Sequence, residues 1–446
     1  MTRGPGWIKI NGMKRREFLK TASASLVAPM IVPASVFSRP GPSDQLSVGC
    51  IGVGRQGQAN MMELLYRGLE AGARVVAVCD LDRHRLDNAR WLAEKTYALE
   101  LGLNKYRGIK AYPDFRELLA SKEVEAVVIS VPDFWHGIVG LTAARAGKDV
   151  YLEKPLTYSL VEGQKLVQAV RQKKLVLQTG SQQRSSVYFL KACEIVRNGL
   201  LGQLQSIKVR LPEDSGRGEP GPMPVPPNLD YEFWLGPTPA APYSEDRVHP
   251  QMSYERPGWM QIEPYGRGMI TNWGAHMLDV AQWGHGTELS GPVSIEASAE
   301  FPQRGLFNVH TRFRAEAVYA DGVTLSMESG DPSGVRFEGS EGWLFVRREG
   351  IECSNPAWLS YQPGSGQIKL YQSSNHMKNF LQCLRSRQDP AAPVEVGHRS
   401  NSLCIITHIA MKLGRKLRWD PDKEQFVGDD EANRLLDYPR PQPWQI

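Results

Sequence analysis

Three glycines near the start of the sequence have the spacing of a loop that binds the phosphates of a dinucleotide. Gly52, Gly54 and Gly57 form a G-x-G-x-x-G pattern directly after an apolar run at residues 46–51, which predicts a buried parallel strand. In such a loop the first glycine allows a tight turn, the second lets the pyrophosphate approach the backbone, and the third lets the helix pack closely against the strand. The start of the following helix then offers free N–H groups and the positive end of its dipole to the phosphates.

An acidic residue at the end of the next predicted strand supports dinucleotide binding and favours NAD over NADP. The apolar run at residues 73–79 ends at Asp80, and a carboxylate there can accept hydrogen bonds from both ribose hydroxyls. The same charge would repel the 2′-phosphate of NADP. Arg55, inside the glycine loop, leaves NADP as the less favoured alternative, because an arginine near the ribose can bind that phosphate.

The regions around this loop alternate strand and helix patterns, which predicts a doubly wound parallel sheet of the Rossmann type. Strands are expected at residues 126–130 and 149–152, with helices at 82–98, 112–119 and 160–172. Ligands of such sheets bind beyond the carboxyl ends of the strands. Residues in the glycine loop and just after the strands are therefore the candidates for binding the cofactor: Arg55, Gln56, Ser130, Pro132, Asp133, His136, Glu153, Lys154 and Gln182.

From about residue 204 the pattern changes to period-two alternation, which predicts a second α/β domain with a largely antiparallel open sheet. The alternating runs lie at residues 205–211, 294–301, 313–319, 324–327, 335–337 and 343–347. The exposed face of this sheet is expected either to cover the substrate or to form the interface of a homo-oligomer, a dimer or a tetramer. The expected division of the chain is a signal and linker at 1–44, the Rossmann domain at 45–178, the second domain at 179–420 and a tail at 421–446.

Two proline-rich stretches interrupt the second domain. Residues 212–227 and 236–264 are too long for simple connections, so they are expected to form lids or interface arms, with a solvated surface loop as the alternative. Amphipathic helices are expected at 376–387 and 401–413, able to pack back onto the Rossmann domain, and the tail after them is expected to be extended.

A second group of residues has the chemistry of proton transfer. Asn272, His276 and Asp279 are four and three residues apart, so on a helix they share one face. A histidine that titrates near neutral pH can move the proton that accompanies hydride transfer, and Lys154, desolvated beside a nicotinamide, can have a lowered pKa and share this role. The alternative for His276 is a structural position in the helix. The candidate catalytic residues are Lys154, His276 and Asn272, and the candidate substrate-binding residues are Trp135, Lys154, Arg184, Asn272 and His276.

The run Glu153-Lys154-Pro155 and the segment at residues 268–279 together resemble the Gfo/Idh/MocA family, which contains glucose–fructose oxidoreductase and inositol dehydrogenase. The resemblance extends from about residue 46 to the C-terminus. It implies that Lys154 contacts the nicotinamide ribose and the substrate hydroxyl, and that Pro155 follows a cis peptide bond that fixes this lysine. It also implies that His276 takes or gives the proton of that hydroxyl.

Two positions depart from the family's patterns. Asn272 stands where the D-x-x-x-H pattern has aspartate, and Asp133 stands where the T-P-N-x-x-H pattern has asparagine. An asparagine can orient His276 by a hydrogen bond but cannot stabilise an imidazolium as a carboxylate would. The features that look like the exported, twin-arginine-bearing bacterial branch of the family are Trp135-His136 and residues 147–151 and 243–247.

The first 44 residues have the pattern of an export signal. Arg15 and Arg16 precede Phe-Leu-Lys, and an uncharged stretch of small residues follows at 21–37, which is typical of a twin-arginine signal. We therefore expect the twin-arginine export machinery to deliver the folded protein to the periplasm, with the signal either cleaved near residues 34–38 or retained as an anchor. The stretch is too short and too rich in Ala, Ser and Pro to be a typical membrane span. The alternative to an export signal is a disordered basic arm.

The composition excludes several other functions. The 53 Lys and Arg residues are scattered among 48 Asp and Glu, and the net charge of +5 is small, so no nucleic-acid-binding surface is expected. The six cysteines form no C-x-x-C pair or zinc-like cluster, so no metal site is expected.

The sequence favours an NAD-dependent oxidoreductase acting on a sugar, glycoside or sugar derivative, with a tightly bound cofactor. The alternatives are an NAD-dependent glycoside hydrolase, which oxidises, eliminates and re-reduces its substrate, and a non-catalytic nucleotide-binding protein.

Overall fold

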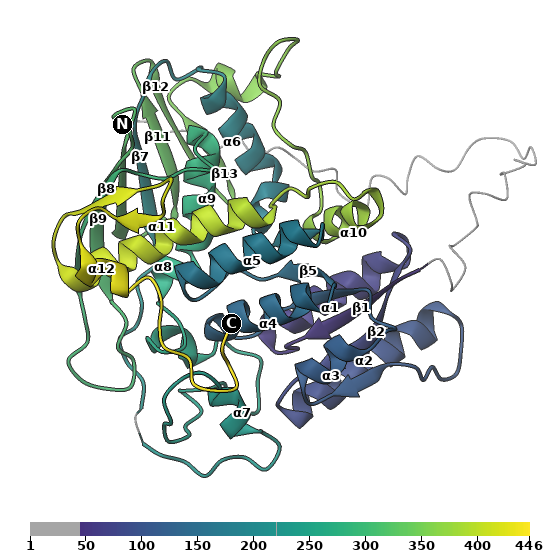
Figure 1. Cartoon of the computed structure of the whole chain (residues 1–446). Coiled ribbons are helices and arrows are strands. Elements are labelled where there is room, and N and C mark those ends of the chain that lie inside the picture. Colours follow the sequence, from purple (N-terminus) through teal and green to yellow (C-terminus); the bar gives the residue numbers. More distant parts are fainter. Residues whose placement is uncertain (1–44, 220) are drawn as a thin grey trace, which may run out of the picture.

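The computed structural model describes residues 45–219 and 221–446, which form two α/β units side by side (Figure 1). The predicted twin-arginine segment lies outside the described residues. Within the described part of the chain, no helix is long and apolar enough to cross a membrane.

The first unit is a six-stranded, fully parallel sheet with the strand order β3-β2-β1-β4-β5-β6. Its strand order reverses direction between β1 and β4, and ligands of doubly wound sheets bind in the crevice at that point. The predicted Rossmann fold is confirmed. Its strands are β1 (Leu46–Ile51), β2 (Ala73–Cys79), β3 (Lys110–Tyr112), β4 (Ala126–Ile129), β5 (Asp149–Leu152) and β6 (Leu177–Thr179).

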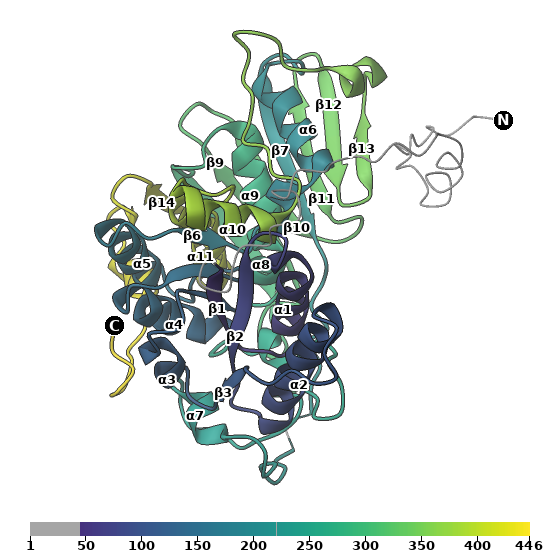
Figure 2. The ribbon, with the colours of Figure 1, turned by 90° about the vertical axis from the view of Figure 1, so that its right-hand side faces the viewer.

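Helices cover both faces of this sheet (Figure 2). Helices α1 and α2 pack on one face of the sheet through one apolar core. Helices α3, α4 and α5 pack on the other face through a second apolar core. Their starts follow capping chemistry: Asp82 and Asp114 accept backbone N–H bonds at α2 and α3, and Ser159 forms a capping box with Glu162 at α5. The helices are α1 (Arg55–Gly68), α2 (Arg83–Glu100), α3 (Phe115–Ala120), α4 (Asp133–Arg145) and α5 (Leu160–Gln172).

The second unit is built on a nine-stranded sheet with the order β13-β12-β11-β7-β10-β9-β8-β14-β15. All of its strand pairs are antiparallel except β7 with β10, as expected for a largely antiparallel sheet. Its strands are β7 (Leu204–Leu211), β8 (Ser294–Glu300), β9 (Arg312–Val318), β10 (Thr324–Ser329), β11 (Gly334–Gly339), β12 (Gly342–Arg347), β13 (Gly350–Cys353), β14 (Leu417–Asp420) and β15 (Gln425–Phe426).

Helices α6, α9 and α11 cover one face of this sheet and bury its alternating apolar side chains. The opposite face presents charged side chains such as Lys208, Arg210 and Glu328. The helices of this unit and its connections are α6 (Val187–Arg197), α7 (Tyr231–Leu235), α8 (Met269–Asn272), α9 (Gly274–His285), α10 (His376–Ser386), α11 (Val394–Leu413) and α12 (Asp430–Arg434).

The C-terminal helices connect the two units. Helix α10 packs on α1 and contributes to the same apolar core as α1 and α2. Helix α11 packs along α5 between the units (Figure 1). It begins at Val394, directly after Pro393, and therefore earlier than the predicted start at residue 401.

The expectation of an extended tail is wrong. Residues 421–446 contain β15 and α12, and the end of the chain packs on the Rossmann unit. Arg440 donates a hydrogen bond of 3.1 Å to Glu162, whose side chain is fully buried, and Trp444 stacks on Phe233 with ring centroids 5.3 Å apart. A buried carboxylate requires a paired cation, so this ion pair holds the tail against α5.

Candidate active site

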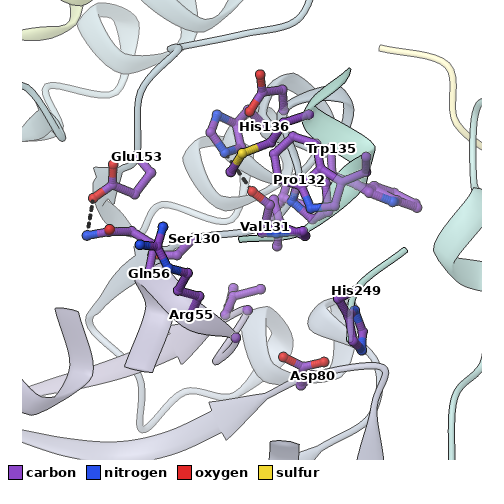
Figure 3. Close-up of a pocket in the computed structure, with 18 of the residues that line it drawn as sticks. Arg55, Gln56, Asp80, Ser130, Val131, Pro132, Trp135, His136, Glu153 and His249 are labelled. Atoms are coloured by element: carbon purple, nitrogen blue, oxygen red, sulfur yellow. Dashed lines mark hydrogen bonds between the residues drawn. The ribbon is translucent and has the colours of Figure 1, made fainter. Parts of the chain in front are cut away.

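A cavity of about 580 Å³ lies where the two units meet (Figure 3). Its wall is formed by the glycine loop, the carboxyl ends of the parallel strands, the second proline-rich stretch and the turn between β12 and β13. The structure brings most of the predicted site residues to this wall: Gly52, Gly54, Arg55, Gln56, Asp80, Ser130, Pro132, Asp133, Trp135, His136, Glu153, Lys154, Asn272 and His276.

The glycine loop has the geometry that a pyrophosphate requires. Gly52 has a φ of +76°, which a residue with a side chain rarely adopts. A Cβ atom on Gly57 would lie 1.8 Å from the Gly52 carbonyl oxygen, so Gly57 supports the loop from behind without lining the cavity. Gly54 precedes α1 and has no side chain to cap it, so the first N–H groups of the helix are open to an anion.

Asp80 is held at the end of β2 by two backbone hydrogen bonds. Its Oδ2 accepts the N–H of Val53 and its Oδ1 accepts the N–H of Asp82, both at 2.9 Å. Burial raises the pKa of Asp80, and these two bonds oppose the shift. Each carboxylate oxygen keeps a second acceptor position for a ribose hydroxyl. The glycine loop and Asp80 therefore fit a dinucleotide.

Glu153 is the centre of a hydrogen-bond network at the other end of the cavity (Figure 3). Its Oε1 accepts bonds from Asn60 Nδ2 at 3.0 Å, Gln182 Nε2 at 2.8 Å and Gln56 Nε2 at 3.4 Å. Burial raises the pKa of Glu153, while the charge of Lys154 and these bonds lower it. Gln182 does not line the cavity, so here it positions Glu153 and does not face a cofactor directly.

His136 supports the backbone that carries Lys154. Its Nδ1 lies 2.5 Å from the carbonyl oxygen of Pro155, and its Nε2 lies 2.9 Å from that of Val131. Burial lowers the pKa of His136 to about 4, so the ring is neutral near pH 7 and donates to one of these carbonyls. The Lys154–Pro155 peptide bond is cis, which confirms that expectation.

Lys154 and Asp133 are ionisable groups whose charges interact across the cavity. Burial lowers the pKa of Lys154, while the charges of Glu153 and Asp133 raise it. Burial also raises the pKa of Asp133 to about 7, against the opposing charge of Lys154. A lysine with a lowered pKa can accept a proton, and a carboxyl group that titrates near neutrality can exchange one.

His276 and Asn272 are arranged differently from the prediction. Asn272 ends α8 and His276 lies in α9, and Trp273, the single residue between the two helices, keeps a right-handed helical conformation. Asn272 Nδ2 contacts the Met260 sulfur at 3.0 Å, and His276 Nδ1 has no hydrogen-bond partner among the described residues. The expected hydrogen bond between Asn272 and His276 is therefore absent from the described structure.

The expectation that His276 titrates near neutrality is also wrong. Burial, together with the positive charges of Lys154 and Arg348, lowers the pKa of His276 well below its usual value. The imidazole is therefore neutral at physiological pH. It faces the cavity as a hydrogen-bonding group, which leaves Lys154 as the stronger candidate for proton transfer.

The comparison with known families covers both units of the chain. Residues 46–181 match the Gfo/Idh/MocA model described as "Oxidoreductase family, NAD-binding Rossmann fold". Residues 195–446 match the Gfo/Idh/MocA model described as "Oxidoreductase family, C-terminal alpha/beta domain". The chain belongs to the Gfo/Idh/MocA family. Its first unit is accordingly an NAD-binding Rossmann domain.

Curated relatives match less than half of this chain. Inositol 2-dehydrogenase of Salmonella paratyphi B is 30% identical over 159 residues, which cover 35% of this chain and 43% of the relative. Myo-inositol 2-dehydrogenase of Thermotoga maritima is 28% identical over 186 residues, 42% of this chain and 48% of the relative. The chain therefore spans less than half the length of these relatives.

Solved structures of similar architecture extend over most of the chain. The WlbA dehydrogenase from Bordetella pertussis, in complex with NADH and UDP-GlcNAcA, superposes with a TM-score of 0.60 at 16% identity and covers 84% of this chain and 99% of that one. The aldose-aldose oxidoreductase from Caulobacter crescentus, complexed with glycerol, has a TM-score of 0.56 at 18% identity and the same two coverages. At these identities the likeness establishes the fold of this Gfo/Idh/MocA member.

Arg184 is the predicted site residue that the structure places elsewhere. It does not line the cavity, and its side chain is 4% exposed. Its Nε and Nη2 donate to the two oxygens of Asp279 at 2.7 and 2.9 Å, and its Nη1 donates to Glu288 at 2.8 Å. The structure does not support the prediction that Arg184 binds substrate, because its guanidinium neutralises two carboxylates inside the second unit.

The prediction did not include several residues that line the cavity of this Gfo/Idh/MocA member. They come from the second proline-rich stretch and the β12–β13 turn, and no spacing relates them to the glycine loop. An aromatic residue in a proline-rich stretch was the weak signal that pointed towards one of them, Trp259. These cavity residues are His249, Arg256, Trp259, Met260 and Arg348. Asn60 of α1 was also not predicted, and it supports Glu153 without lining the cavity.

Proposed function

We propose that this protein is an NAD-dependent oxidoreductase that oxidises a hydroxyl group of a sugar or sugar derivative. One observation carries the proposal: the dinucleotide cradle, the proton-accepting Lys154 and the hydrogen-bonding His276 line the same cavity. The inositol dehydrogenases among the relatives support a polyhydroxylated substrate. Bound NAD would supply the hydride acceptor.

The residues of the chain then have separate roles. The neutral amine of Lys154 accepts the proton of the substrate hydroxyl at Nζ, and desolvation makes this neutral form more accessible. The neutral imidazole of His276 hydrogen-bonds the substrate and orients it. Asp133, with its pKa raised to about 7, stabilises the protonated lysine and can exchange a proton with it. The Glu153 network and His136 keep Lys154 in place.

We assign the cofactor as NAD rather than NADP. The carboxylate of Asp80 faces the cavity, and a 2′-phosphate beside it would suffer like-charge repulsion. Arg55 and Arg85 also line the cavity, and they are the residues through which NADP could bind instead. Arg85 is engaged elsewhere, because its Nη2 donates to the carbonyl oxygens of Pro250 and Ser253 at 3.0 and 3.2 Å.

The reaction is tested on the purified protein without added nucleotide. Acid denaturation is expected to release NAD, and a panel of sugars added to the native protein is expected to reduce the bound nicotinamide, seen as its absorbance. Release of NADP would contradict the cofactor assignment. Cleavage of an aryl glycoside without net nicotinamide reduction would favour the hydrolase alternative. Absence of both reactions with NAD bound would favour a non-catalytic nucleotide-binding protein.

The cofactor is proposed to remain bound because a strap, residues 249–257, lines the cavity, with His249 on the same side as Asp80 (Figure 3). Besides the Arg85 bonds, His249 Nε2 lies 3.0 Å from Asp82 Oδ2. Asn228 Nδ2 donates to Asp82 at 2.8 Å and to Gln251 at 3.0 Å. Opening the strap requires these bonds to break, which slows release of a nucleotide beneath it.

Loosening the strap is expected to speed the loss of NAD. Asn88 donates to the hydroxyl of Tyr254 at 3.0 Å, and neither Asn88 nor Asn228 lines the cavity. Replacing both with alanine removes strap anchors, and the dissociation rate of the nucleotide, bound as NADH and followed by its nicotinamide fluorescence during dilution, should rise about tenfold. Asn198→Ala, in the second unit, is the control. An unchanged rate in the double variant would show that the strap does not retain NAD.

We further propose that the protein is exported folded by the twin-arginine machinery, carrying its nucleotide with it. Free NAD is scarce outside the cytoplasm, so a retained cofactor would be regenerated in place by a second substrate or within one catalytic cycle. Replacing Arg15 and Arg16 together with lysine should leave the protein in the cytoplasmic fraction. Unchanged export of this variant would contradict the proposal.

We also propose that the charged face of the nine-stranded sheet is the interface of a homo-oligomer, a dimer or a tetramer. Of the two functions expected for this face, covering the substrate does not fit the structure. The cavity is lined from this unit by residues of the proline-rich stretch, α8, α9 and the β12–β13 turn, whereas the strands of the sheet do not contribute.

A further inference from the structure

Two arginines from distant parts of the chain line the cavity without a carboxylate partner. Arg256 belongs to the strap and Arg348 to the turn between β12 and β13. Neither makes an ion pair with a carboxylate among the described residues. Among the described residues, the hydrogen bonds of Arg256 go to sulfur atoms, through Nε to Met260 and Nη2 to Met269, both at 3.4 Å. Thioether sulfur is a weak acceptor, so most of the N–H donors of Arg256 remain available.

Arg348 is held by an aromatic ring. Its Cζ atom lies 4.5 Å from the centroid of the Trp273 ring, and this same ring lies edge-on to His276. The neighbouring Glu349 pairs with Arg347 at 3.5 Å and makes no ion pair with Arg348 among the described residues, although its charge raises the pKa of Arg348. A guanidinium stacked on an aromatic face keeps its in-plane donors free, so Arg348 is oriented to bind an acceptor.

Other arginines in this chain show what a structural arginine looks like. Arg184 and Arg440 are bonded to buried carboxylates, and their pKa values are raised as a result. Burial instead lowers the pKa of Arg256 and of Arg348, although the charges of Asp214 and Asp133 partly oppose the shift at Arg256 and the charge of Glu349 partly opposes it at Arg348. Partial desolvation of a cation without a carboxylate partner costs free energy, and an anionic ligand would recover it.

The two arginines lie at the catalytic end of the cavity. The charges of both act on Lys154, and the charge of Arg348 acts on His276. Both residues are exposed to solvent and line the cavity, so a ligand inside the cavity can reach them. A ligand whose hydroxyl group reaches Lys154 is therefore close enough to experience the positive charge of both guanidinium groups.

We propose that Arg256 and Arg348 bind an anionic group on the substrate, so that the site selects an acidic sugar, with a carboxylate or a phosphate, over the corresponding neutral sugar. This inference rests on the proposed function and deepens it by naming the substrate class. Guanidinium groups bind both carboxylate and phosphate by paired hydrogen bonds. The reacting hydroxyl would lie between Lys154 and His276, with the anionic group directed to the arginines.

Binding to the NAD-saturated protein tests the proposal directly. The probes are D-glucose, D-glucuronate and D-glucose 6-phosphate, with D-galactose and D-galacturonate as a second neutral–acidic pair, and the readout is titration calorimetry. We expect at least one acidic sugar to bind more tightly than its neutral counterpart, with affinity that falls as the salt concentration rises. Tighter binding of a uronate would identify the anionic group as a carboxylate, and tighter binding of D-glucose 6-phosphate would identify it as a phosphate. Equal or tighter binding of the neutral sugars, or no binding of any probe, would overturn the proposal.

Three variants locate the anion site. Arg348→Gln and Arg256→Gln should each weaken binding of the acidic sugar about 10- to 100-fold, as expected for losing hydrogen bonds to a charged group. Binding of the neutral sugar should stay within about threefold in both variants, because it offers the arginines no anionic group. Binding of NAD should stay within about threefold in Arg348→Gln, because Arg348 lies outside the strap. Arg336→Gln is the matched control, since Arg336 also lies over a tryptophan, with its Cζ 4.0 Å from the Trp343 ring centroid, but on the charged face of the sheet.

The outcomes separate this inference from the proposed function. If the variants weaken NAD rather than the acidic sugar, the arginines bind the cofactor's pyrophosphate and the inference is overturned. If neutral sugars are oxidised with kinetics that the variants do not change, the inference fails and the oxidoreductase function stands. If the acidic sugar binds through both arginines but no sugar reduces NAD, the anion site stands and the oxidoreductase function fails.

Discussion

Replacing Lys154 with methionine is expected to lower kcat for sugar oxidation about 10²- to 10⁴-fold, the usual contribution of a general acid–base group. Methionine keeps the length of the side chain and removes the amine that accepts the hydroxyl proton. NAD should remain bound, because the glycine loop, Asp80 and the strap are untouched. The measurement is kcat with a saturating sugar, together with the nucleotide content of the purified variant.

The pH dependence of the wild type gives a second measurement of the same role. Proton transfer requires the neutral amine, so kcat should rise with pH through the pKa of Lys154, which burial places below the usual value for lysine. Lys154→Arg should also be inactive, because an arginine stays protonated. Lys95→Met, on the outer surface of α2, is the control. A Lys154→Met variant that keeps most of its activity and its pH profile would exclude Lys154 as the proton acceptor.

Replacing Gly57 with alanine is expected to destabilise the Rossmann unit by more than about 4 kcal/mol and to abolish NAD binding. The added Cβ would lie 1.8 Å from the carbonyl oxygen of Gly52 and 2.7 Å from its carbonyl carbon. Both atoms belong to the backbone of the phosphate loop, so relief requires α1 and β1 to separate. Helix propensity alone favours alanine over glycine by about 1 kcal/mol. The variant is nevertheless expected to be less stable, because the steric clash outweighs this preference.

Denaturant unfolding and NAD titration of the Gly57→Ala variant provide the measurement. Tyr66→Ala on the same helix is the control, because Tyr66 is 62% exposed, and its stability should change by less than about 0.5 kcal/mol. A Gly57→Ala protein that is as stable as the wild type and binds NAD would show that the close approach of α1 to the glycine loop is not required.

The sequence by itself determined the parallel sheet and most of the cavity wall. Hydrophobic periodicity is a local property, so the strands before Asp80, Asp133 and Glu153 could be identified without knowing their neighbours. In a parallel sheet the carboxyl ends of all strands meet at one edge. Recognising the strands was therefore sufficient to predict that Asp80, Asp133 and Lys154 lie around one cavity with the glycine loop.

The predicted pair of Asn272 and His276 shows where reasoning from residue spacing was insufficient. The spacing of Asn272 and His276 predicts a shared helical face with a hydrogen bond between them, but the side chain of Asn272 contacts Met260 instead. The low pKa of His276 depends on burial and on the charges of Lys154 and Arg348. Such effects are determined by the distances between side chains from separate segments, which residue spacing does not contain.

Only the tertiary structure decided which charged residues are structural and which are available for a ligand. Arg184 follows a strand of the parallel sheet as a site residue would, yet it is buried against Asp279 and Glu288. Arg256 and Arg348 are remote from every motif, yet they line the cavity without carboxylate partners. The physical reason is that the strength of an ion pair depends on burial and separation in space, and both are set by the packing of the two units.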